Sequence, residues 1–157
     1  MIGDLSHYAN YERGGMATLV GAFPVCLPNE PDGTIALPRI ERALSTVKDN
    51  HISPIVGLSL ESSHNICSGR VLSLNYISQV KKILKKKKLR LHLDGARCWN
   101  AAVHLGVDMK TYTKDFDLVS ACFSKGMGCP LGSLVIGSHE DIEHARNWRK
   151  MLGGGMR

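Results

Sequence analysis

Strand-like apolar runs alternate with amphipathic segments through the middle of the sequence, and this alternation constrains the fold more than any other feature. Leu, Ile and Val recur on one helical face in two segments, and a third helical segment ends at a glycine. The predicted helices span 37–47, 74–88 and 95–106. The predicted strands span 54–62, 89–94 and 116–124. Strands and helices in this order predict an α/β fold with a largely parallel sheet and right-handed crossovers.

The sequence that follows predicts a change of strand direction. Segment 131–138 has the composition of a further strand, but the loop 125–131 is too short for a helical crossover, so we expect this strand to run antiparallel. Ser138 and Asp141 have the spacing of a capping box. They predict the start of a last helix, which ends before Gly153.

Composition limits the class of protein and its partners. The chain has 157 residues, 43% hydrophobic and 22% charged, which is typical of one globular domain. Its net charge of +6 is concentrated in 81–90, a lysine run without interleaved aromatic residues, so no nucleic-acid partner is expected. The five cysteines form no CxxC pair, and no apolar run reaches the roughly 18 residues of a membrane span. These features favour a soluble, cytoplasmic protein with reduced thiols and no membrane partner.

Two polar residues stand directly at the ends of predicted strands. Asp94 ends one strand and Lys125 follows the next. The carboxyl ends of parallel strands meet at one edge of a sheet, where ligands bind, so we expect both side chains there. Asp94 could pair with a cation such as a protonated pyridine ring, or it could cap the next helix. Lys125, set among small residues, could be an exposed structural lysine or a partly buried nucleophile with a lowered pKa.

Four motifs carry a resemblance that runs along essentially the whole chain. They are SHYANYERGGMATLVGAFP, HLDGARCWNAAVHLGV, SKGMGCPLGS and RKMLGGGMR. Together they closely resemble the low-specificity threonine aldolases, which are pyridoxal-phosphate enzymes of the aspartate-aminotransferase fold. The resemblance implies a three-layer αβα arrangement around a mostly parallel sheet. It also implies an incomplete large domain, because the family's phosphate-binding donors lie before the first motif and a small domain follows the last.

The resemblance assigns roles to residues at the predicted sheet edge. Lys125 matches the lysine that forms a Schiff base with the cofactor. Ser124, next to it, is also expected to bind the cofactor. Asp94 matches the partner of the pyridine nitrogen. Arg97 matches an arginine of the cofactor site that faces the substrate carboxylate.

Further matches lie elsewhere in the chain. His7 matches the histidine that stacks on the cofactor ring, and Glu12 matches the acidic residue near it. His51 matches a histidine near the substrate hydroxyl, contributed across a subunit interface. Lys150 and Arg157 match basic residues near the cofactor phosphate or the neighbouring subunit. His7, His51 and an ordered water are the candidates for the catalytic base.

The segment 61–71 departs from the family pattern. Ser62, Ser63 and Ser68 stand where an amide, a threonine and a glycine are usual. His64 and Arg70 are expected to order this turn rather than to take part in chemistry, because its residues are turn formers.

The implied reaction is cleavage of threonine or allo-threonine to glycine and acetaldehyde, in a homodimer or homotetramer without a metal ion. Two alternatives remain: another pyridoxal-phosphate lyase of the same fold, such as a β-eliminating enzyme, and a non-catalytic chain that associates with a complete subunit. Because the family's phosphate-binding donors are not among residues 1–157, this segment alone is expected to bind the cofactor weakly.

Overall fold

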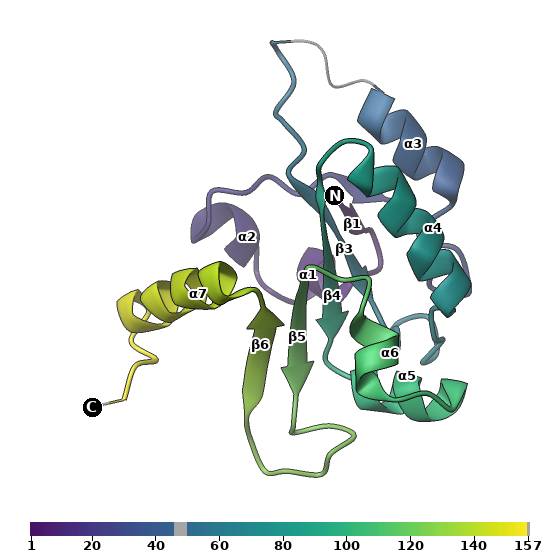
Figure 1. Ribbon diagram of the computed structural model, residues 1–157. Coiled ribbons are helices and arrows are strands. Elements are labelled where there is room, and N and C mark those ends of the chain that lie inside the picture. The colour runs from purple at the N-terminus through teal and green to yellow at the C-terminus, as the bar shows by residue number, and fades with distance from the viewer. Residues whose placement is uncertain (46–49, 157) are drawn as a thin grey trace.

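A four-stranded sheet forms the centre of the computed structural model, which describes residues 1–45 and 50–156 (Figure 1). The parallel strands are β3 (Gly57–Glu61), β4 (Arg90–Gly95) and β5 (Leu118–Cys122). The strand β6 (Ser133–Gly137) runs antiparallel to β5, so the spatial order is β3-β4-β5-β6. The predicted strands and the predicted reversal of direction are confirmed.

Four helices pack on one face of this sheet (Figure 1). They are α3 (Leu37–Ser45), α4 (Leu74–Lys85), α5 (Cys98–Leu105) and α6 (Met109–Thr113). Alternate strand residues point toward these helices and are buried in the hydrophobic core: Leu58, Leu60, Leu91, Leu93, Val119 and Ala121. The helices contribute mainly aliphatic side chains to the same core: Ile40, Leu44, Ile77, Val80, Leu84, Cys98, Ala101, Ala102 and Tyr112. The strand periodicity therefore decides which face the helices cover.

The other face of the sheet is polar toward its carboxyl edge and carries α1 (His7–Asn10). Tyr8 of α1 lies against His92 of β4 and within 3.3 Å of the Ser120 hydroxyl of β5. The helices α2 (Gly15–Thr18) and α7 (His139–Met151) also lie on the side of the sheet away from α4, α5 and α6 (Figure 1). The fold is thus α/β with helices on both sides of a mostly parallel sheet, as predicted.

The N-terminal segment is anchored to the edge strand β3. Its first strand, β1 (Ile2–Gly3), pairs with β2 (Cys26–Leu27) in a small parallel sheet. The ammonium group of Met1 donates to the Gly57 carbonyl at 2.7 Å, and the Ser59 amide donates to the Met1 carbonyl at 3.0 Å. These bonds carry the chain along β3, so that α1 reaches the carboxyl end of the central sheet.

The predicted helix 74–88 is too long at its C-terminus. α4 ends at Lys85, because Lys88 takes a left-handed conformation with φ of 56° and the Leu89 amide donates to the Leu84 carbonyl at 3.1 Å. This bond closes the helix end and turns the chain into β4. The predicted helix 37–47 is confirmed as far as Ser45, and its last two residues lie outside the described residues.

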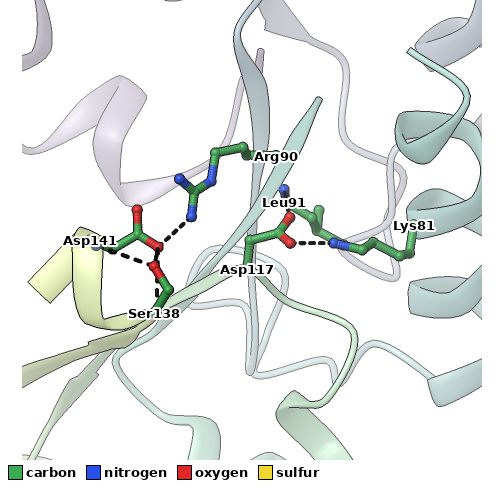
Figure 2. Close-up of polar contacts among 6 residues, drawn as sticks. All are labelled: Lys81, Arg90, Leu91, Asp117, Ser138 and Asp141. Atoms are coloured by element: carbon green, nitrogen blue, oxygen red, sulfur yellow. Dashed lines mark hydrogen bonds and ion pairs between the residues drawn. The ribbon is translucent and has the colours of Figure 1, made fainter. Parts of the chain in front are cut away.

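Two acidic residues, Asp117 and Asp141, form hydrogen bonds at the amino end of β4 (Figure 2). Asp117 accepts hydrogen bonds from Lys81 Nζ at 2.6 Å and from the Leu91 amide at 2.7 Å. Asp141 completes the predicted capping box with Ser138, and its Oδ2 accepts from Arg90 at 2.5 Å. The bond from Arg90, followed by that from Ser138, lowers the pKa of Asp141 to about 2. The strands and α7 are therefore held together at the end away from the carboxyl edge.

Candidate active site

A cavity of about 280 Å³ opens at the carboxyl edge of the central sheet. Its described lining comes from segments far apart in the sequence, namely α1, the ends of β3, β4 and β5, the loop after β5, and β6. The lining residues are His7, Tyr8, Glu12, Glu61, Asn65, Asp94, Ala96, Arg97, Ser120, Ala121, Cys122, Lys125, Ser133, Leu134 and Val135. The predicted meeting of Asp94, Lys125 and His7 at one edge is confirmed.

Asp94 is buried, with 6% of its surface exposed. Burial raises the pKa of its carboxyl group, the Ala96 amide that donates to Oδ1 at 3.2 Å opposes this shift, and nearby Glu61 reinforces it. The nearby His7 and Lys125 side chains act in the opposite direction and lower this pKa. The capping alternative is not borne out for α5, because its N-cap is Arg97. Asp94 therefore presents a buried carboxylate to the cavity and favours a cation there.

His7 begins α1 and lies at the mouth of the cavity. Its Nε2 is 2.9 Å from Glu12 Oε1, and its ring stacks on Tyr11 with centroids 5.4 Å apart. The His7 backbone amide donates to Glu61 Oε2 at 2.8 Å. The ring is thus oriented by contacts on its side chain and on its main chain.

Lys125 follows β5 in an exposed loop, and its side chain reaches the cavity. Of the two alternatives for this lysine, the described residues leave it exposed rather than partly buried. Packing explains why residue 126, next to this lysine, is a glycine. A Cβ on Gly126 would lie 2.0 Å from Asn100 Oδ1 of α5. The glycine therefore lets the loop lie directly against α5, which fixes where Lys125 leaves the sheet edge.

Of the other predicted site residues, Arg97 lines the cavity, whereas Ser124 and His51 are not among its lining residues. Arg97 is partly buried and lines the cavity beside Asp94. Ser124 is exposed and is not among the described lining residues. His51 is exposed in the segment before β3, at the amino end of the sheet and thus opposite to the Lys125 loop (Figure 1). Its role across a subunit interface stays a prediction.

The basic residues near the C-terminus are not gathered at this cavity. Lys150 lies on α7 and is exposed, outside the described lining of the cavity. Arg157 lies outside the described residues. The turn 61–71 is ordered by its own residues, because the His64 amide donates to the Arg70 carbonyl at 2.8 Å and the Cys67 amide donates to His64 Nδ1 at 3.4 Å. That His64 and Arg70 take no part in chemistry stays a prediction.

Sequence reasoning missed the residues that support the site from the polar face of the sheet. Glu61 is 5% exposed and accepts backbone hydrogen bonds with both carboxylate oxygens. Burial raises the pKa of Tyr8 to about 12 and lowers the pKa of His92 to about 4. The register of the predicted strands could have indicated Glu61 and Ser120, because both are paired with Asp94 across β3, β4 and β5.

The described residues give no sign of a metal centre, a disulfide or a membrane span. Over residues 1–45 and 50–156, no group of three or more His, Cys, Asp or Glu side chains is arranged to hold a metal ion. The five cysteines form no disulfide in the described residues. None of the helices in the described part of the chain is both long and apolar enough to cross a bilayer.

Comparison with known proteins gives a family match and several similar sequences. A sequence profile of the beta-eliminating lyase family matches residues 1–157. Low-specificity L-threonine aldolase 1 of Arabidopsis thaliana is 43% identical over 158 residues, covering 100% of this chain and 44% of that protein. The low specificity L-threonine aldolase of Escherichia coli K12 is 38% identical over 157 residues, covering 100% of this chain and 46% of that protein. The chain spans less than half the length of both relatives.

Solved structures with a similar fold include a threonine aldolase and a C–S lyase. The threonine aldolase of Leishmania major superposes with a TM-score of 0.83 at 22% sequence identity, over 97% of this chain and 44% of that one. A pyridoxal-phosphate-bound C–S lyase of Staphylococcus hominis superposes less closely, with a TM-score of 0.65 at 17% identity. Both comparisons concern the fold, and they agree with the mostly parallel sheet described above.

Proposed function

Because the chain belongs to the beta-eliminating lyase family, we propose that it carries the cofactor face of a pyridoxal-phosphate-dependent aldolase that cleaves threonine to glycine and acetaldehyde. The observation that carries this proposal is the meeting of Asp94, Lys125, His7 and Arg97 in one cavity. Their chemical types are a buried carboxylate, a primary amine, a flat ring and a guanidinium. The names of the threonine aldolases that match the chain point to the same reaction.

The donor set fits the cofactor group by group. The buried Asp94 carboxylate pairs with a protonated pyridine nitrogen, because burial without a cation is costly for a charged carboxylate. The exposed Lys125 amine is free to form a covalent bond to the cofactor aldehyde. The His7 side chain lines the cavity and would offer a flat ring for stacking. When bound, pyridoxal phosphate supplies an electron sink for the bond that breaks between Cα and Cβ of the amino acid.

The remaining cavity residues bind and orient the amino acid. Arg97 offers a planar guanidinium, which binds a carboxylate with two parallel hydrogen bonds. The contact of His7 Nε2 with Glu12 Oε1, at 2.9 Å, holds the imidazole ring in one orientation and leaves Nδ1 as the nitrogen that can accept a proton. His7 is therefore a candidate to accept the proton of the substrate hydroxyl, and His51 of a neighbouring subunit is the alternative.

We also propose a reducing compartment such as the cytoplasm and an assembly of two or more subunits. Five free cysteines favour reducing conditions. Apolar side chains on β6 and α7 are exposed in the isolated chain, including Ile136 at 48% and Met151 at 66%. Such residues are commonly covered by further protein.

Product analysis tests this function and separates it from β-elimination. The full-length protein that contains this segment is incubated with threonine and pyridoxal phosphate, and acetaldehyde with glycine is the expected outcome. Pyruvate or another keto acid with ammonia would instead assign a β-eliminating lyase. Lys125→Ala should abolish acetaldehyde formation, whereas the matched Lys82→Ala on the exposed side of α4 should retain it. Full activity in Lys125→Ala would contradict the proposal.

A further inference from the structure

Two buried carboxylates lie next to each other at the edge of the cavity. Glu61 ends β3 and Asp94 lies near the end of β4, and they are direct partners in the parallel register. Glu61 is 5% exposed and Asp94 is 6% exposed. The cation that Asp94 would bind balances its charge, whereas Glu61 forms no salt bridge within the described part of the chain. A buried charge needs hydrogen bonds instead.

Glu61 obtains these hydrogen bonds from two backbone amides. Its Oε2 accepts from the His7 amide at 2.8 Å, and its Oε1 accepts from the Asn65 amide at 2.9 Å. One amide belongs to the N-terminal segment and the other to the turn after β3. A carboxylate is suited to this position because it offers two acceptor oxygens, whereas a glutamine side chain offers one.

The bond to His7 replaces the usual capping of α1. Ser6 occupies the N-cap position, but it makes no side-chain capping hydrogen bond. Its buried hydroxyl has no hydrogen-bond partner. The first amide of a helix has no acceptor within the helix, and here Glu61 provides it from 54 positions away in the sequence. A carboxylate is also the charge that the N-terminus of a helix favours.

We propose that Glu61 is a positioning residue, which fixes the His7 backbone so that the imidazole ring stays at the cavity that it lines together with Asp94. The contacts of the His7 side chain with Glu12 and Tyr11 come from the same short segment and move with it. Tyr8 OH lies 3.3 Å from Ser120 Oγ and holds the next residue to β5. Glu61 therefore provides the bond from His7 itself to the central sheet. Its catalytic consequence rests on the proposed function, but the bond itself does not.

The test compares Glu61→Gln with Asp4→Asn. Asp4 is a matched control, because its Oδ1 also accepts a backbone amide, that of Asn29 at 2.8 Å, and anchors the same N-terminal segment away from the cavity. Glutamine keeps one neutral acceptor oxygen for the two amides, and a neutral oxygen is a weaker acceptor than a carboxylate. Hydrogen exchange of the His7 amide in the cofactor-free protein should therefore be about tenfold faster in Glu61→Gln. In Asp4→Asn this amide should exchange as in the parent protein.

Activity per bound cofactor is measured at a temperature where both variants are folded. Glu61→Gln should lower kcat about tenfold to a hundredfold, because a displaced catalytic group is costly, while Asp4→Asn retains parental kcat. If Glu61→Gln does not fold, Glu61→Asp takes its place, since the shorter side chain keeps the charge but cannot reach both amides. Unchanged His7 exchange, or an equal loss of kcat in both variants, would overturn the proposal. If the parent protein does not cleave threonine, the proposed function has failed, and the exchange measurement alone decides the role of Glu61.

Discussion

The Ser59 hydroxyl lies 2.8 Å from Nδ1 of His92, and the two side chains form a neutral pair on the polar face of the sheet beneath the site. Burial lowers the pKa of His92 from 6.5 to about 4. The unfolded chain would bind a proton at this histidine near pH 6.5, whereas the folded chain would not bind it until about pH 4. The contribution of His92 to stability is therefore fully present above pH 6.5 and is lost as the pH falls toward 4.

We predict that His92→Asn reduces the acid sensitivity of the fold. The shift from 6.5 to about 4 corresponds to a loss of about 3 kcal/mol in the free energy of unfolding across that window. Asparagine can retain a hydrogen bond to Ser59 but does not titrate. Urea unfolding at a series of pH values measures the difference, and exposed His104→Asn is the control. Equal acid slopes for His92→Asn and the parent protein would contradict this account.

Asp94→Asn should separate stability from cofactor binding. Burial raises the pKa of Asp94, so its charged form destabilises the cofactor-free fold at neutral pH. The amide should therefore leave the free energy of unfolding unchanged or higher. It should also weaken pyridoxal-phosphate binding about tenfold to a hundredfold, because a charge-assisted bond to the pyridine nitrogen is lost. Calorimetry and spectral titration measure the two effects, and unchanged cofactor affinity would refute the role of Asp94.

Gly95→Ala should displace Asp94 by forcing β4 away from β5. A Cβ at Gly95 would lie 2.8 Å from the Ser120 carbonyl oxygen and 3.0 Å from Cβ of Cys98. The closest neighbour is backbone and cannot rotate away, so a loss of about 1–3 kcal/mol in unfolding free energy is expected. Gly15→Ala is the control, because a Cβ there meets nothing within 4 Å. Equal stability of the two variants would show that the strands tolerate the added carbon.

The central sheet and the Asp94–Lys125 pair could be predicted because both follow from local patterns. Alternating leucines marked the strands, and parallel pairing brings their carboxyl ends to one edge regardless of sequence separation. The capping box at Ser138 was equally local. The end of α4 was misjudged, because a left-handed residue such as Lys88 leaves no mark in hydrophobic periodicity.

The support of the site could not be predicted, because it depends on long-range contacts. The strands β1 and β2 have two residues each, too few for a recognisable alternation. The bond from His7 to Glu61 joins residues 54 positions apart, and no spacing rule anticipates it. The exposure of Lys125 likewise depends on what packs around its loop rather than on its sequence neighbours.

The identity of the lysine that holds the cofactor tests the central claim most directly. The protein is incubated with pyridoxal phosphate, treated with borohydride and digested, and the modified peptide is identified by mass spectrometry. We predict that the cofactor mass is found on Lys125, which lines the cavity with Asp94 and His7. Modification of a different lysine in a protein that cleaves threonine, with Lys125 unmodified, would contradict the site described here.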